Sequence, residues 1–277
     1  MKKMRKLLYF ITLSLAIISC SSNPTDEERA QVFLDNAKTF YDQKKLEAAK
    51  IELDSLHEVF PKLIAFRRQA DTLNWHIELE EIARNLVYID SMLPIKNIEV
   101  TTFQKSFVFE KDTKFQHLGN FVYNSLKTEN NLQRDYLKPY VEEDGRMYIV
   151  SYYIGRAINH YQLKVSVDDL FAETLPVEST ERHSYTDLGV FHETVLFQPD
   201  RLVQVPDFIT LNKNEKLRIT LIGTSNYSYY LSDLEKNAFV ETYKLATLLA
   251  DITQFKESQK RMIVRRELLN KKLKDTL

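Results

Sequence analysis

The chain has 277 residues, of which 44% are hydrophobic, 12% aromatic and 28% charged. This composition supplies enough apolar material for a sizeable core and excludes a disordered chain. With only 5 Gly and 7 Pro, and with neither GxxxxGK[ST] nor GxGxxG, the sequence offers little from which to build a phosphate-binding loop. A nucleotide-binding enzyme is therefore disfavoured.

The first twenty residues have the layout of an export signal. A basic segment, residues 1–6, precedes an apolar segment, residues 7–18, that is too short to span a bilayer. Ser19 and Cys20 follow, and Cys20 is the only cysteine. Ile17–Cys20 resembles the lipobox of bacterial lipoproteins, which have a type II signal peptide. The resemblance implies that residues 1–19 are removed and that Cys20 carries the lipid. The alternatives are an uncleaved signal anchor and a soluble secreted protein.

Removal of residues 1–19 would leave 258 residues and take away Lys2, Lys3, Arg5 and Lys6, which moves the formal charge from −1 to −5. A mildly acidic exported protein gives no electrostatic reason to expect nucleic acid as a partner. Residues 20–25 are expected to form a lipidated tether. No stretch after residue 20 approaches the about 20 apolar residues of a membrane-spanning helix, so the lipid would be the only membrane anchor. Ser21 resembles the outer-membrane default of lipoprotein sorting, with the periplasmic or surface face left open.

The tether is followed by a predicted helical hairpin. Thr25 and Glu28 form a capping-box pattern that starts a helix. Residues 33–61 resemble one tetratricopeptide repeat, a helix–turn–helix unit of about 34 residues. The matching positions are Phe33, Ala37, Phe40, Ala49, Leu53 and Pro61, and Asn36 departs from the pattern. The resemblance implies a protein-interaction or scaffolding role, and the alternative is a generic helical hairpin.

Two long amphipathic helices are predicted, one on each side of the middle of the chain. The first covers about residues 62–92, and the second begins at a capping box formed by Ser232 and Glu235. Heptad-like seams follow both helices, through Trp75, Leu79, Ile82, Leu86, Ile89 and Leu93 in the first and Leu248, Phe255, Met262 and Leu269 in the second. We expect an antiparallel pair that forms a coiled-coil-like stalk. Either seam could instead form a homo-oligomer.

Between these helices the sequence changes to strand signals. Five segments rich in β-branched and aromatic residues are predicted strands: 105–109, 146–153, 161–167, 190–197 and 216–222. No helical run separates them, which favours an antiparallel sheet or small sandwich. A short helix is expected within 115–138 and a turn at Asp144-Gly145. The predicted fold is α+β, with helical residues 26–93, an inserted antiparallel β module at 94–231 and a C-terminal helix at 232–277. The family of the β module is not recognised.

The β module contains few candidate catalytic or metal-binding residues. A loop and a strand could bring His183, Asp187, His192 and Glu193 to one metal or acid–base site. Against this, His192 and Glu193 alternate on a strand and so point to opposite faces, and the spacing matches no metal motif. We therefore expect no catalytic residues, no metal and no cofactor, with His183 and His192 as the weak metal candidates.

Ligand-binding candidates come from a loop and from aromatic side chains. Arg156 and His160 lie in a predicted hairpin connection, where Gly155 and Asn159 could instead serve only as turn residues. Aromatic residues of the β module could form a platform for sugar rings or a peptide, although sheet packing is the favoured explanation. They are Tyr152, Tyr153, Tyr227, Tyr229, Tyr230 and Phe121. We take Arg156, His160, Tyr152 and Tyr229 as the candidate ligand-binding residues.

These observations predict a lipid-anchored protein of the bacterial cell envelope. Its expected role is non-catalytic binding or scaffolding through protein partners in the envelope, with the membrane contacted through the lipid on Cys20. The alternative is an envelope hydrolase, or a glycan-processing or glycan-binding protein, with a site in the β module around His160 or His183. An enzyme is thus the less favoured possibility.

Overall fold

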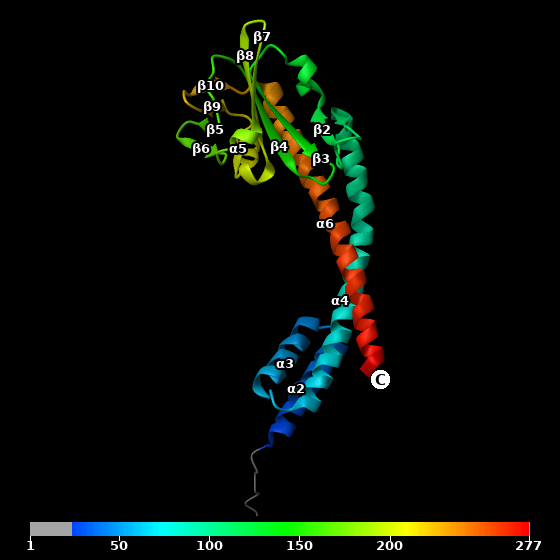
Figure 1. Cartoon of the computed structure of the whole chain (residues 1–277). Coiled ribbons are helices and arrows are strands. Elements are labelled where there is room, and N and C mark those ends of the chain that lie inside the picture. The colour runs from blue at the N-terminus through cyan, green and yellow to red at the C-terminus, as the bar shows by residue number, and fades with distance from the viewer. Residues whose placement is uncertain (1–23, 277) are drawn as a thin grey trace, which may run out of the picture. The chain divides into compact units, whose positions relative to one another are not determined.

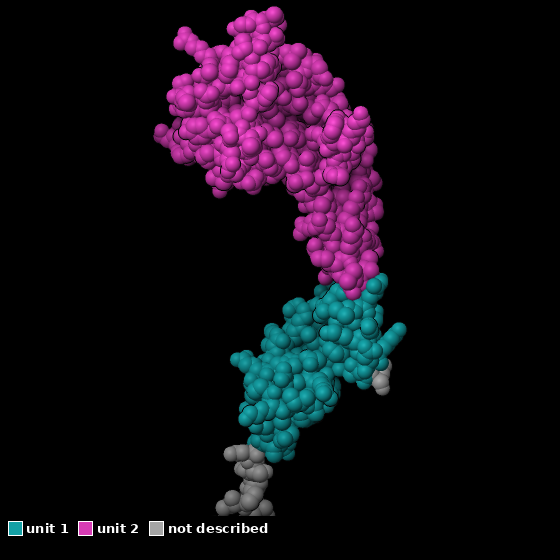
Figure 2. Space-filling view, viewed as in Figure 1, with its two compact units in different colours: residues 1–84, 265–277 teal, residues 85–264 magenta. Residues whose placement is uncertain are grey.

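The computed structural model describes residues 24–276, so the predicted signal, Cys20 and most of the tether lie outside the described residues. The fold is α+β, as predicted (Figure 1). The described residues divide into two compact units: unit 1 comprises 24–84 and 265–276, and unit 2 comprises 85–264 (Figure 2). In this part of the chain, no helix has the length and apolar character needed to cross a membrane.

Unit 1 begins with the predicted helical hairpin, α2 (Asp26–Asp42) and α3 (Leu46–Val59). The capping box at its start is confirmed: the Glu28 N–H donates to Thr25 Oγ1 at 3.2 Å, and the Thr25 N–H donates to Glu28 Oε2 at 2.8 Å. Ala37 and Ala49 are fully buried in the core of this unit. Small side chains at these positions let two helices pack closely. The tetratricopeptide resemblance itself stays a prediction.

The two long helices are α4 (Ile64–Phe103) and α6 (Asp233–Thr276), and they pack together as predicted. The Ser232–Glu235 capping box is confirmed, since the Glu235 N–H donates to Ser232 Oγ at 3.3 Å and the Ser232 N–H donates to Glu235 Oε2 at 3.1 Å. Polar pairs between the helices run in antiparallel order: Glu78–Arg265 in unit 1, then Asp90–Gln259 and Lys96–Asp251 in unit 2.

Helix α4 continues through Pro94 to Phe103, eleven residues beyond residue 92, where the sequence predicts its end. A proline inside a helix removes one hydrogen bond and costs about 3 kcal/mol or more. Packing offsets this cost, because Val100 is 6% exposed, and Leu93 and Phe103 contact the core of unit 2. Lys96 also donates to Asp251 at 2.9 Å. Tertiary contacts therefore override the local helix-stop signal.

Unit 2 contains two antiparallel sheets. Sheet A has the order β1-β2-β3-β4-β8-β7, and sheet B has the order β10-β9-β5-β6. The strands of sheet A are β1 (Phe107–Glu110), β2 (Asn120–Tyr123), β3 (Tyr136–Glu142), β4 (Met147–Gly155), β7 (Arg182–Asp187) and β8 (Val190–Phe197). Those of sheet B are β5 (Gln162–Val167), β6 (Leu170–Glu173), β9 (Arg218–Ile222) and β10 (Tyr227–Tyr230).

All five predicted strands are present, and five others were not predicted: β2, β3, β6, β7 and β10. The helix expected within 115–138 is wrong, because this segment holds β2, the start of β3 and two 3₁₀ turns, η2 (Asn124–Leu126) and η3 (Thr128–Asn130). The predicted turn between β3 and β4 is confirmed. Gly145 has φ +93°, and a Cβ there would lie 2.3 Å from the Ala250 backbone nitrogen of α6. Only glycine fits this turn.

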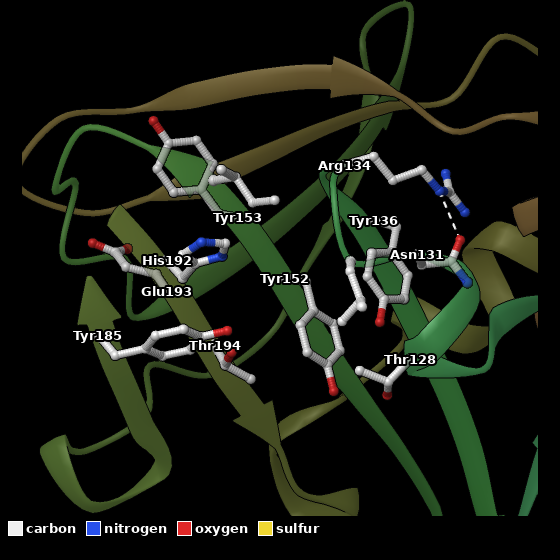
Figure 3. Close-up of a pocket in the computed structure, with 12 residues that line it drawn as sticks. Thr128, Asn131, Arg134, Tyr136, Tyr152, Tyr153, Tyr185, His192, Glu193 and Thr194 are labelled. Carbon is white, nitrogen blue, oxygen red and sulfur yellow. Dashed lines mark hydrogen bonds between the residues drawn. The ribbon is translucent and has the colours of Figure 1, made fainter. Parts of the chain in front are cut away.

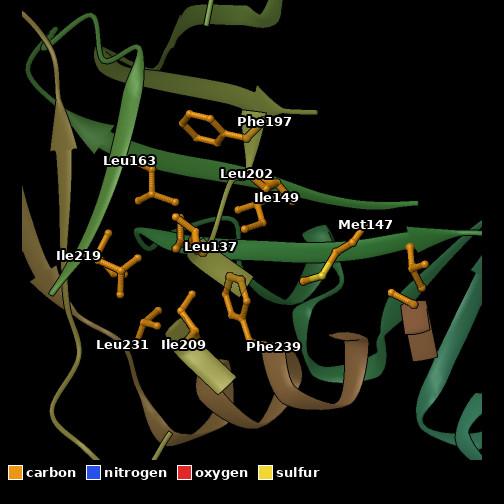
Figure 4. Close-up of a cluster of buried hydrophobic side chains, with 14 of the residues drawn as sticks. Leu137, Met147, Ile149, Leu163, Phe197, Leu202, Ile209, Ile219, Leu231 and Phe239 are labelled. Atoms are coloured by element: carbon orange, nitrogen blue, oxygen red, sulfur yellow. The ribbon is translucent and has the colours of Figure 1, made fainter. Parts of the chain in front are cut away.

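The core of unit 2 lies between the inner faces of the two sheets and is extended by α6 and by the short helix α5 (Val205–Leu211) (Figure 4). Strand alternation directs Ile149 and Phe197 of sheet A toward Leu163 and Ile219 of sheet B, and all four are fully buried. Phe239 of α6 joins the same cluster. The opposite face of sheet A is here called the outer face.

Candidate functional site

The outer face of sheet A carries paired aromatic rings on neighbouring strands. Tyr136 of β3 lies directly opposite Tyr152 of β4, and their rings stack 4.5 Å apart at an angle of 4°. Tyr185 of β7 lies opposite His192 of β8, and these rings stack 4.8 Å apart at 2°. Direct cross-strand pairing brings such rings together. The result is a set of flat aromatic surfaces on one face of the sheet.

A small pocket opens on this face, with a cavity volume of about 40 Å³ (Figure 3). Strands β3, β4, β7 and β8 supply most of its wall, and the segment that precedes β3 supplies the rest. The lining residues are Thr128, Asn131, Leu132, Arg134, Tyr136, Tyr152, Tyr153, Ile154, Tyr185, His192, Glu193 and Thr194. Leu132, at the rim, is 61% exposed.

Tyr136 gives this pocket an unpaired hydrogen-bonding group. Its side chain is 1% exposed, and its hydroxyl makes no hydrogen bond of normal geometry among the described residues, while the Thr128 and Tyr152 side chains lie close enough to influence its pKa. Burial is the main cause that raises the pKa of Tyr136, so the phenol stays protonated at neutral pH. A buried hydroxyl without a partner is costly. It therefore marks a place where an incoming polar group would be stabilised.

Arg134 forms a positively charged wall of the same pocket. Its Nε donates to Asn131 Oδ1 at 2.7 Å, and its guanidinium lies 5.2 Å from the centre of the Tyr136 ring (Figure 3). Asn131 is itself held by the backbone oxygens of Ser125 and Lys127. Glu235 lies 3.5 Å from Arg134 Nη1 and compensates part of the charge. The guanidinium is therefore ordered before any ligand arrives.

A second polar cluster lies inside the β module and links its two sheets. Ser151 Oγ of β4 lies 2.5 Å from His160 Nε2, and His160 Nδ1 lies 2.6 Å from Glu193 Oε2 of β8. This Ser–His–Glu order is the connectivity of an acyl-transfer triad, in which histidine takes a proton from serine and a carboxylate orients the ring. The connectivity alone does not make a catalytic site, because a nucleophile must also reach its substrate.

The surroundings of this cluster favour a structural role. Ser151 and His160 are 0% exposed and Glu193 is 4% exposed. A cavity of about 220 Å³ reaches His160 and Glu193, but Ser151 does not line it. The Glu193 carboxylate also accepts from the backbone N–H groups of Ile158, Asn159 and His160. Its four hydrogen bonds attach the segment that enters sheet B to β8 of sheet A.

The charge state of Glu193 follows from these bonds. Burial raises the pKa of Glu193, but hydrogen bonds from the His160 side chain and from the backbone of Asn159 and His160 outweigh burial. The pKa of this carboxyl is therefore held below its ordinary value, so Glu193 is charged at neutral pH. The ionised Glu193 carboxylate accepts four hydrogen bonds and so holds residues 158–160 against β8.

The four predicted ligand-binding residues do not form one site. Tyr152 lines the outer-face pocket, whereas His160 is enclosed between the sheets. Arg156 is exposed in the connection between β4 and β5. Tyr229 of β10 faces the core, where its hydroxyl is buried and unpaired among the described residues. The aromatic platform is likewise divided, because Tyr152 and Tyr153 point to opposite faces of β4.

The strand pairing corrects the predicted hairpin connection and shows where the two histidine metal candidates lie. The segment 156–161 is not a hairpin connection, since β4 pairs with β3 and β8 while β5 pairs with β6 and β9. It crosses from one sheet to the other, with Asn159 at φ +49°. His183 and His192 lie on the outer face with Tyr185 between them, and Glu193 points inward. Within residues 24–276, no group of three or more His, Cys, Asp or Glu side chains is placed to hold a metal ion.

Sequence reasoning missed Arg134, Tyr136 and Tyr185, which all line the outer-face pocket. Tyr136 begins a strand that contains Pro139, and Tyr185 lies in a strand with almost no apolar residues. The one available signal was the alternation of tyrosines at 136, 140, 148 and 152, which places them on one face of two adjacent strands.

No protein-family model matches the chain, and no curated protein or solved structure matches it either. The assignment of function therefore depends on the residues and the geometry described above.

Proposed function

We propose that this chain is a lipid-anchored cell-envelope protein that works by binding a protein partner rather than by catalysis. The anchoring part of the proposal is supported by the resemblance of Ile17–Cys20 to a lipobox and by the basic and apolar segments that precede it. Cys20 is the lipid-attachment residue in this proposal. The outer membrane is the proposed location.

The binding part is carried by one observation: the buried, unpaired Tyr136 hydroxyl in a pocket walled by stacked rings and by Arg134. Tyrosine and arginine are the residue types that concentrate binding energy at protein interfaces. The cavity of about 40 Å³ is far smaller than the about 300–1,000 Å³ of small-molecule sites. Its size suits the polar end of one partner side chain, with the surrounding rings in contact with the rest of the partner.

Anchoring is tested by growing cells with a fatty acid that carries a chemical tag. The wild-type protein is expected to incorporate the tag and to remain with the membrane fraction after a high-salt wash. The Cys20→Ala variant is expected to lose the tag. Equal incorporation in both proteins would refute lipidation at Cys20.

Partner binding is tested with a photo-crosslinking amino acid at Leu132, which is 61% exposed at the pocket rim. Leu170, 63% exposed on sheet B, is the matched control position. We expect one defined envelope protein to crosslink at 132 and not at 170. Because Tyr136→Phe removes only the unpaired hydroxyl, it should lower the crosslinking yield by about 2–10-fold, the equivalent of one hydrogen bond. Tyr140→Phe, on the same sheet face outside the pocket, should leave the yield unchanged. Equal yields for the two phenylalanine variants would contradict the proposed site.

A hydrolase is the second candidate, because the Ser151–His160–Glu193 connectivity matches a triad. A fluorophosphonate probe labels activated serines and gives a direct readout. We expect no labelling that depends on Ser151. Labelling of the wild-type protein that is lost in Ser151→Ala would replace the binding proposal with an acyl-transfer activity.

A further inference from the structure

Strand β7 forms an open edge of sheet A. It pairs with β8 through six consecutive residues, 182–187, and ends the sheet order. The Arg182 N–H donates to the Ser179 oxygen, and no other backbone hydrogen bond joins these six residues to any described segment except β8. In an antiparallel ladder, alternate residues direct their N–H and C=O groups away from the existing partner. The outward-directed backbone groups of residues 183–187 are therefore available to another strand.

This edge lacks lysine, proline and a β-bulge, three features that commonly prevent strand addition. Natural edge strands are protected by charged side chains, especially lysine, by proline or by a β-bulge. The charged residues of β7, Arg182 and Asp187, lie at its two ends. Residues 182–187 contain neither Lys nor Pro, and their register with β8 is unbroken. Five of the six residues are exposed. An edge of this kind favours pairing with a further strand.

The side chains of β7 are complementary to those of a second copy in antiparallel register. With a two-fold axis through Tyr185, His183 faces Asp187 of the second copy on the outer face, and Ser184 faces Thr186 of the second copy on the inner face. Each pair combines a hydrogen-bond donor with an acceptor. A neighbouring register, with the axis at Ser184, would place Asp187 opposite Glu181, and like charges directly opposite each other are destabilising.

We propose that β7 pairs antiparallel with β7 of a second copy of this chain, about a two-fold axis at Tyr185, to form one continuous sheet. The hairpin tip supports this occupant. Leu188, at φ +47°, is 96% exposed, and in the proposed register it lies opposite Arg182 of the second copy. Contact with the second copy would remove this exposed apolar side chain from water.

Pairing in this register changes the outer-face pocket. Tyr185 lines that pocket and stacks on His192. The second copy adds its own Tyr185 ring directly beside this pair on the same face of the sheet. The row of rings then continues from one copy to the next, and the two pockets share one surface. The pairing itself does not depend on what binds in the pocket.

The register is tested by disulfide trapping in the full chain with Cys20→Ala, purified in detergent, so that each introduced cysteine is the only thiol. Directly opposite residues in an antiparallel pair have Cα atoms about 4.5–5.5 Å apart, within disulfide range. We expect Tyr185→Cys to give a disulfide-linked dimer on mild oxidation. Ser184→Cys alone should not, because two copies of residue 184 would be offset by two residues along the strands, beyond about 7 Å. A mixture of Ser184→Cys and Thr186→Cys should crosslink.

Leu170→Cys, at an exposed position on sheet B, measures random collisions. Dimer formation by Tyr185→Cys no greater than by Leu170→Cys would overturn the proposal, and so would crosslinking by Ser184→Cys alone.

A second measurement avoids introduced cysteines. Light scattering after size-exclusion chromatography should show a dimer fraction that rises with protein concentration. Asp187→Lys should lower that fraction severalfold, because it removes the acceptor for His183 and places a lysine on the edge. Asp169→Lys, at the exposed β5–β6 turn, should leave the fraction unchanged. A monomer at all concentrations, or equal effects of the two lysine variants, would refute pairing through β7.

Discussion

Glu193→Gln tests whether the enclosed polar cluster stabilises unit 2. Glu193 Oε1 accepts from the N–H groups of Ile158 and Asn159, and Oε2 accepts from the N–H and Nδ1 of His160. A glutamine keeps one acceptor oxygen and places an NH₂ group against two of these donors. If the His160 ring changes tautomer, one buried N–H still lacks an acceptor, which costs about 1–3 kcal/mol. If the ring does not change, two donors lack acceptors and the cost is about twice that.

The assay is urea unfolding followed by the near-ultraviolet circular dichroism of tyrosine, because the only tryptophan, Trp75, lies in unit 1. Glu173→Gln is the matched control. Glu173 pairs with Lys164 at 3.1 Å, with both side chains about one-third exposed, so its loss should cost under about 1 kcal/mol. If Glu193→Gln costs no more than Glu173→Gln, the cluster does not hold the sheets together and the reasoning is wrong.

The same carboxylate predicts how stability depends on pH. Hydrogen bonds hold the pKa of Glu193 below its ordinary 4.5 despite burial. The folded-state pKa is thus lower than the unfolded one, so this contribution is complete above about pH 4.5 and is lost as the pH falls through the folded pKa. Unfolding measured from pH 7 downward should show a loss of stability below pH 4.5 that is smaller in Glu193→Gln. Parallel pH profiles would contradict this.

Two further substitutions test the packing. Gly145→Ala should destabilise unit 2 by more than Gly189→Ala in urea unfolding, because both residues have positive φ but only at 145 would a Cβ meet the Ala250 backbone, at 2.3 Å. Gly189→Ala should cost about 1–2 kcal/mol, and equal costs would refute the steric argument. Arg265→Ala breaks a two-bond ion pair with Glu78 whose side chains are 43% and 29% exposed. Because solvent screens this pair, the loss should stay under about 1 kcal/mol in an unfolding curve followed by tryptophan fluorescence, and a loss above about 2 kcal/mol would show a larger role.

Local signals predicted much of the helical part of this fold. Thr25 with Glu28 and Ser232 with Glu235 each lie within four residues, and both capping boxes form as expected. Heptad spacing likewise predicted the pairing of α4 with α6. The predicted helix end near residue 92 was wrong because the contacts that sustain the helix past Pro94, such as Lys96 with Asp251, come from distant sequence.

The site depends on strand register, which the sequence did not reveal. Tyr136 meets Tyr152 only because β3 and β4 pair in one register, and the strand that holds Tyr185 reads as a polar loop. His160 and Glu193 are 33 residues apart, and they meet because a connection crosses between the sheets. Alternation did predict correctly that His192 and Glu193 point to opposite faces.

Unit 1 is built from two segments that lie far apart in the sequence, and this has a consequence for biosynthesis. Residues 24–84 and the last turns of α6, residues 265–276, belong to the same unit, and Leu269 in those turns is 0% exposed. A ribosome delivers these last residues only after all of unit 2 has been made. Unit 2 is able to complete its fold while translation is still in progress, whereas the core of unit 1 is complete only after residues 265–276 have been made. A chain truncated near residue 264 would therefore show its defect at the opposite end of its sequence, in the helices that were synthesised first.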